Sequence, residues 1–137
     1  MANSGPGTPK IPEGGPSSPT ISTHVLDVES GKPASGVHVS LYKLGEDDRP
    51  IRLTQALTDG EGRIRDLLER PISPGTYRLE FNLAAPPGSD AAAPAMGGGG
   101  HPFFRRMSVD LRIEDTSRSY HVPLLLAPYS MTTYRGS

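Results

Sequence analysis

Apolar and polar residues alternate with a period of two along most of this chain, and that period constrains the fold more than any other feature. A period of two is typical of a β-strand with one face buried and the other exposed. The pattern is clearest in residues 76–83, where every second residue is aromatic or aliphatic. Seven segments carry it and are predicted to be strands: residues 21–26, 37–44, 51–58, 76–83, 107–113, 120–126 and 129–134.

Turn residues separate these segments, and no segment has the 3.6-residue period of a long amphipathic helix. Asp59-Gly60-Glu61-Gly62 and Pro71–Gly75 are strong turn signals. Residues 64–68 fit either a short strand or one helical turn. The sequence therefore predicts an all-β fold, an antiparallel β-sandwich of about eight strands with at most one short helix.

Glycine and proline are unevenly distributed, and their distribution predicts the domain boundaries. The chain has 137 residues with 16 Gly and 15 Pro; nine of these lie in residues 1–20 and nine in residues 84–102. Segments this poor in apolar side chains cannot offset the entropy lost on ordering. We expect a disordered tail over 1–20, one domain over 21–137, and a flexible Ala/Gly/Pro-rich insertion at 84–102.

Charge and composition exclude several classes of protein. The net charge of −1 argues against nucleic acid or a membrane surface as partner. The absence of cysteine excludes thiol chemistry, disulfides and thiolate zinc sites. No apolar run is long enough to span a bilayer, and the N-terminus lacks a secretory signal segment, so the cytoplasm is the expected compartment.

Four histidines are the candidate acid–base groups, since imidazole titrates near neutral pH. His38 fits the polar face of a strand, and His101 lies in the insertion, so both have a simple surface interpretation. His24 and His121 stand beside inward-facing strand residues, and each has either a structural or a functional interpretation. Pro123 interrupts the strand after His121, which predicts a bulge or an edge strand there.

The sequence gives little support for a metal site, a serine nucleophile or a calcium loop. The histidine spacings fit no short metal-ligand motif, and no G-x-S-x-G elbow is present. The Asp59–Gly62 segment lacks the alternating ligands of a calcium loop. Arg63, directly after this turn, is either a surface charge or a guanidinium that holds a planar, oxygen-rich ligand. Residues 134–137, Tyr-Arg-Gly-Ser, are either a frayed end or part of a site.

Taken together, the sequence segments that contain these residues resemble the transthyretin-like family, and within it the 5-hydroxyisourate hydrolases. The resemblance covers residues 21–83 and 103–137 and ends in the Tyr-Arg-Gly-Ser signature that separates the hydrolases from the hormone carrier transthyretin. The segments that carry it are STHVLD (22–27), GKPA (31–34) with GV (36–37), DGEGRI (59–64), GTYRLEF (75–81) and YHVPLLLAPYSMTTYRGS (120–137).

The resemblance implies an eight-stranded transthyretin-like (prealbumin-like) sandwich that assembles as a homotetramer, a dimer of dimers, with sites in the channel between dimers. It implies no metal and no organic cofactor. The implied catalytic residues are His24, Arg63 and His121, and the implied substrate-binding residues are Tyr134, Arg135, Gly136 and Ser137.

The implied reaction is hydrolysis of 5-hydroxyisourate to 2-oxo-4-hydroxy-4-carboxy-5-ureidoimidazoline in urate (purine) degradation, by attack of water on a ring carbonyl. This step needs a base, an oxyanion donor and a proton for the leaving nitrogen, which two histidines and an arginine can supply. A transthyretin-type carrier without catalysis is the alternative, and a plain β-sandwich interaction module is a third.

The chain departs from the family pattern in three places. Residues 84–102 replace a shorter segment that often holds a helix. Arg105 and Arg106 follow the aromatic pair Phe103-Phe104 where Pro-Glu is usual, and Met131 stands where an aromatic is frequent. These departures affect the local fold over 84–106 and the pocket wall, but not the three implied catalytic positions.

Overall fold

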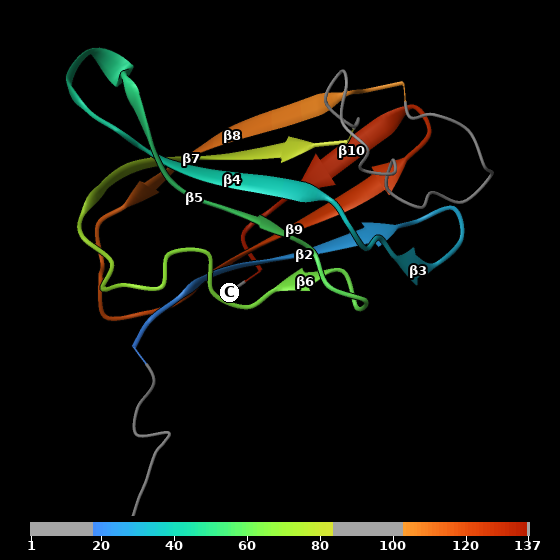
Figure 1. Ribbon diagram of the computed structural model, residues 1–137, viewed down its shortest axis with the longest axis horizontal. Helices are drawn as coiled ribbons and strands as arrows, with labels where there is room; N and C mark the ends of the chain where they lie inside the picture. The colour runs from blue at the N-terminus through green and yellow to red at the C-terminus, as the bar shows by residue number, and fades with distance from the viewer. Residues whose placement is uncertain (1–17, 84–102, 137) are drawn as a thin grey trace, which may run out of the picture.

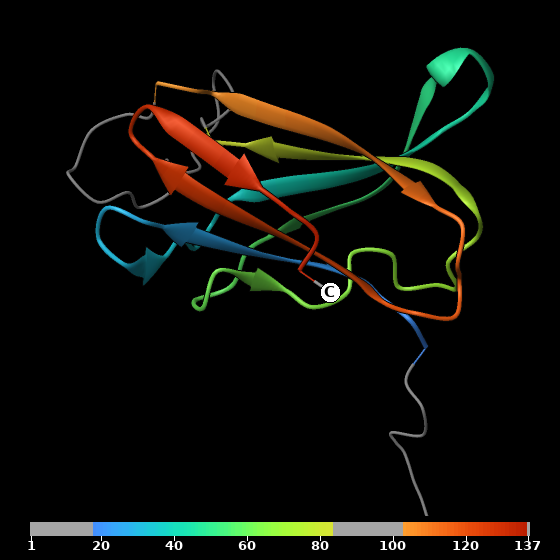
Figure 2. The same ribbon diagram turned by 180° about the vertical axis from the view of Figure 1, so that it is seen from behind.

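The strands form two sheets that face each other as a sandwich (Figures 1 and 2). A computed structural model describes residues 18–83 and 103–136. One sheet has the order β10-β9-β2-β3, with β6 also paired to β2, and the other has the order β5-β4-β7-β8. The first comprises β2 (Ile21–Asp27), β3 (Lys32–Pro33), β6 (Arg63–Ile64), β9 (Tyr120–Ala127) and β10 (Ser130–Thr133); the second comprises β4 (His38–Leu44), β5 (Pro50–Leu57), β7 (Gly75–Asn82) and β8 (Arg106–Ile113).

The predicted fold class is confirmed. Each of the seven predicted strands is present, and the doubtful segment 64–68 contributes only the end of the two-residue strand β6. Within the described residues, the helical structure is one three-residue 3-10 helix, Glu46–Asp48. The predictions for residues 1–17 and for the insertion 84–102 lie outside the described residues.

The core lies between the two sheets and is built from the inward series of each strand. In β7 the inward residues Tyr77, Leu79 and Phe81 are at most 1% exposed, as the alternation predicts. The Tyr77 hydroxyl donates to the carbonyl of Ser73 at 2.7 Å, so its burial leaves no unpaired polar group. The other fully buried residues include Ile21, Val25, Val37, Val39, Leu41, Leu67, Leu68, Ile113, Leu124 and Leu126.

In β5 the apolar series does not form a buried face, contrary to the alternation. Ile51 and Leu57 are 62% and 54% exposed. β5 is an edge strand, and its register with β4 shifts between Leu41 and Tyr42. Ala56 lies opposite the inward-facing Val39, and of the predicted apolar series only Leu53 packs against the core, beside Ala56.

The pairing of β2 with β9 is parallel, whereas the other strand pairs among the described residues are antiparallel. Its register runs without a shift from Ile21 opposite Tyr120 to Asp27 opposite Leu126. No bulge is present at Pro123, and β9 as a whole is not an edge strand because it lies between β2 and β10, so the edge prediction holds only locally. The paired part of β10 ends opposite Leu124, so Pro123 lies just outside that ladder, where a proline is tolerated.

A close backbone contact attaches the Asp59–Gly62 turn to β2. Gly62 has a φ of +75°, and its carbonyl accepts a 2.7 Å hydrogen bond from the N–H of Val25. A Cβ at Gly62 would lie 2.4 Å from the Val25 carbonyl oxygen. Glycine is therefore required at this position, both for its conformation and for its lack of a side chain.

We predict that Gly62→Ala lowers the free energy of unfolding by about 2 kcal/mol or more, since it adds left-handed strain to a backbone clash. Gly60→Ala is the matched control: its Cβ would have no neighbour within 4 Å, so we expect a change below about 0.5 kcal/mol. Thermal denaturation at one fixed protein concentration measures both. Equal melting temperatures for the two variants would contradict the prediction.

Candidate active site

Three strands of one sheet bring His24, Arg63 and His121 to the same outer face. On β2 the inward residues are Ile21, Thr23 and Val25, so the alternate residue His24 points outward and is half-buried. Arg63 of β6 lies directly opposite His24 in antiparallel register. His121 of β9 precedes the buried Val122, and it pairs with Ser22, two residues from His24 on the same face.

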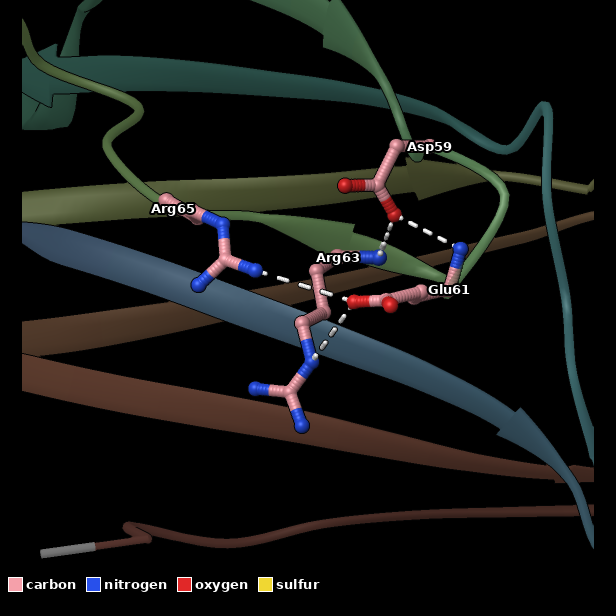
Figure 3. A network of polar contacts seen from close by, with 4 residues as sticks. All are labelled: Asp59, Glu61, Arg63 and Arg65. Carbon is pink, nitrogen blue, oxygen red and sulfur yellow. Dashed lines mark hydrogen bonds and ion pairs between the residues drawn. The ribbon is translucent and has the colours of Figure 1, made fainter.

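The turn before β6 fixes the backbone that carries Arg63 (Figure 3). Asp59 accepts hydrogen bonds from the backbone N–H groups of Glu61 at 2.8 Å and of Arg63 at 2.9 Å. These donors stabilise the carboxylate and hold the pKa of Asp59 below its ordinary value. The two glycines permit the turn, and the hydrogen bonds that the Asp59 side chain accepts fix its backbone. Together they place the start of β6 at Arg63.

The Arg63 guanidinium is less constrained than its backbone. Its side chain is 42% exposed, and its Nε lies 4.0 Å from Oε1 of Glu61, which Arg65 also approaches at 3.6 Å. An exposed ion pair at this distance contributes little to stability. The guanidinium is thus available to an oxygen-rich ligand at modest energetic cost.

His121 is the most strongly contacted residue of the group. Its Nδ1 lies 2.9 Å from the Ser22 hydroxyl, and its carbonyl accepts a 2.7 Å hydrogen bond from the N–H of Gly136. Burial lowers the pKa of His121 below 6.5, and the nearby charges of His24 and Arg63 lower it further. The imidazole is therefore neutral at pH 7, which is the form that can accept a proton.

A small recess opens beside these side chains. It has a volume of about 150 Å³ and is lined by Ser22, Thr23, Arg63, Ile64, Arg65 and His121. Among residues 18–83 and 103–136, no three His, Asp or Glu side chains are placed to hold a metal ion. The groups that face the recess are thus an imidazole, two guanidinium groups and a hydroxyl, which suit a polar ligand with carbonyl or anionic oxygens.

The residues after β10 divide between two locations. The chain turns back after β10 toward β2 and β6 (Figure 2), and Gly136 lies against the His121 ring, where an added Cβ would be 2.7 Å from Cδ2. Tyr134 and Arg135 instead line a separate groove of about 340 Å³ beside β8. The Arg135 guanidinium lies 5.4 Å from the centre of the Tyr120 ring. Ser137 lies outside the described residues.

Sequence reasoning did not single out Ser22 as a site residue. Its contact with His121 joins residues 99 positions apart and depends on the β2–β9 register. The sequence signal that could have identified Ser22 is its position two residues before His24, on the same face of a predicted strand.

Comparisons with known proteins identify relatives of similar sequence and fold. The 5-hydroxyisourate hydrolase of Deinococcus radiodurans is 40% identical over 121 residues, which cover 87% of this chain and 97% of the relative. The structure of Klebsiella pneumoniae 5-hydroxyisourate hydrolase has a TM-score of 0.66 and 33% identity, with 87% and 99% of the two chains covered. Sea bream transthyretin in complex with thyroxine has a TM-score of 0.68 and 26% identity, with 84% and 92% covered.

The sequence model of the HIUase/Transthyretin family matches residues 21–136, which is the whole described domain. Together with the sandwich topology, this match confirms the resemblance that the sequence motifs indicated. The chain belongs to the HIUase/Transthyretin family.

Proposed function

We propose that this chain is a hydrolase that opens 5-hydroxyisourate to 2-oxo-4-hydroxy-4-carboxy-5-ureidoimidazoline. The observation that carries the proposal is the placement of His24, Arg63 and His121 on one sheet face, with Arg63 and His121 lining a polar recess. The curated relatives named 5-hydroxyisourate hydrolase, at up to 40% identity over most of both chains, support it.

In this proposal His121 is the general base, because its lowered pKa keeps it neutral at pH 7. It takes a proton from water as the water oxygen attacks a ring carbonyl carbon of the substrate. The Arg63 guanidinium donates hydrogen bonds to the carbonyl oxygen, which becomes negatively charged in the tetrahedral intermediate.

Collapse of the intermediate breaks the bond between this carbon and the ring nitrogen. The leaving nitrogen needs one proton, which the protonated His121 supplies. His24, opposite Arg63, orients the water or shuttles this proton from His121 to the nitrogen. The carbonyl carbon becomes a carboxylate that stays part of the ring-opened product, so the reaction consumes one water and transfers no electrons. Tyr134, Arg135, Gly136 and Ser137 are the proposed substrate-binding residues. Gly136 lies against the His121 ring, whereas Tyr134 and Arg135 line the separate groove beside β8, so their part in the proposal rests on the family resemblance.

The alternative function is a transthyretin-type carrier of a small molecule without catalysis. The fold alone fits it, since sea bream transthyretin in complex with thyroxine has a similar structure. The polar lining of the recess, with Arg63, Arg65 and His121, favours the hydrolase. Cytoplasmic location stays a prediction from the sequence.

The assembly that we propose is a homotetramer, built as a dimer of dimers. Strands β8 and β10 are sheet edges, and both border the groove that Tyr134 and Arg135 line. At one end of these edges, Phe103 and Tyr129 are 68% and 79% exposed, with ring centres 6.2 Å apart. Exposed edges and aromatic rings of this kind are typical of surfaces that another copy covers.

The function is tested by generating 5-hydroxyisourate from urate with urate oxidase and following its ultraviolet decay. We predict that the chain accelerates the decay above the spontaneous rate and that His121→Gln lowers kcat by about 10²–10⁴-fold, the usual contribution of a general base. His38→Gln, on the other sheet, is the matched control and should retain full activity. Hormone binding by the parent chain without acceleration would favour the carrier instead.

The pH dependence follows from the charges near His121. We predict that the acid limb of the kcat/KM profile, which reports the free enzyme, has its midpoint below pH 6.5, because protonation of His121 removes the base. Arg63→Met removes a positive charge and should raise the pKa of His121, as read from a histidine NMR titration. Arg52→Met, a remote loss of the same charge, should leave that pKa in place. A downward shift in Arg63→Met would contradict this account.

The assembly is tested by sedimentation equilibrium, which should give four times the mass of one chain. We predict that Phe103→Glu dissociates the tetramer, since it places a charge among the exposed aromatic rings. Leu57→Glu, at a residue that is 54% exposed on the opposite edge strand β5, should remain tetrameric. A tetramer that tolerates Phe103→Glu would place the interface elsewhere.

A further inference from the structure

The contacts of His121 restrict which of its ring nitrogens can face a ligand. Ser22 and His121 are register partners on the parallel strands β2 and β9, and both side chains are half-buried on the outer face of the sheet. This register brings the Ser22 hydroxyl to 2.9 Å from Nδ1. With Nδ1 occupied by the protein, Nε2 is the nitrogen left for substrate or water.

A second contact holds the opposite edge of the ring. The Gly136 N–H donates to the His121 carbonyl at 2.7 Å. The Gly136 backbone lies so close to the His121 ring that an added Cβ would be 2.7 Å from Cδ2. The imidazole is therefore held at Nδ1 by a hydrogen bond, and the Gly136 backbone beside Cδ2 leaves no space for a side chain there.

The hydrogen bond at Nδ1 can also decide the tautomer of the ring. A neutral imidazole has one N–H donor and one acceptor nitrogen, and the partner of one nitrogen determines the role of the other. A serine hydroxyl can accept from an Nδ1–H or donate to a bare Nδ1. Only the first arrangement leaves the lone pair on Nε2, where a base for water is needed.

We propose that Ser22 is a positioning residue that accepts the Nδ1–H of His121 and so presents the Nε2 lone pair to the recess. Its effect on turnover rests on the proposed hydrolase function. Its effect on the tautomer does not, because that is a property of the protein alone.

The experiment compares the parent chain with Ser22→Ala, which removes the hydroxyl, and Ser22→Thr, which keeps it on a residue that suits a strand. Ser108→Ala, an exposed serine of β8 in the other sheet, is the matched control. The full chain is labelled with ¹⁵N-histidine, and ring nitrogen shifts at neutral pH report which nitrogen carries the proton. Signals lost in His121→Gln identify His121.

We expect a protonated Nδ1 in the parent, Ser22→Thr and Ser108→Ala, and a shift toward protonated Nε2 in Ser22→Ala. With 5-hydroxyisourate as substrate, Ser22→Ala should lose about 10- to 100-fold in kcat with KM nearly unchanged, the scale of a misplaced catalytic group. Ser22→Thr should recover most of that loss.

Three results would overturn the proposal. A parent ring protonated on Nε2 would show that the hydroxyl donates instead. Unchanged ring shifts and kcat in Ser22→Ala would show that the contact has no positioning effect. A lower kcat with unchanged ring shifts would place the effect of Ser22 elsewhere. If the parent does not hydrolyse 5-hydroxyisourate, the proposed function fails, while the ring shifts still decide the tautomer.

Discussion

Strand β2 lies beside β9 in parallel over its full length, and the geometry of the site depends on this pairing. Antiparallel neighbours would need only a short turn, whereas this pair joins segments about 100 residues apart in the sequence. The register places Ser22 opposite His121, and the next outward residue, His24, meets Arg63 from the other side of β2. Strand β2 therefore carries His24 itself and pairs with the two strands that carry Arg63 and His121.

The site combines like charges, and this has a physical consequence for its acid–base chemistry. His24, Arg63 and His121 can all be cationic, and they lie on one face with the recess between β6 and β9. Their mutual repulsion, added to burial, keeps His121 neutral. The same positive surroundings favour a ligand with anionic or carbonyl oxygens. One arrangement thus supplies both an uncharged base and an attraction for substrate.

The strands and the catalytic candidates could be predicted from the sequence to different degrees. Alternation in β7 gave the right inward residues because that strand is central and one of its faces is buried. Alternation was misleading for β5, an edge strand with a shifted register, in which Ile51 and Leu57 are exposed. The parallel register and the Ser22–His121 contact were beyond sequence reasoning, since neither leaves a local pattern. His24, Arg63 and His121 were found through family motifs, not through periodicity.

The separation between Ser22 and His121 has a consequence for how the site comes into being. Contacts between residues far apart in sequence carry a large loop-closure entropy, and folds that depend on them acquire those contacts slowly. β2 also needs β9 to bury the residues between the two sheets. A chain still emerging from the ribosome can pair β4 with β7, but it has no His121 to set beside Ser22. The β2–β6 pair can already set His24 opposite Arg63, but catalytic competence should arise only when β9 docks and adds His121.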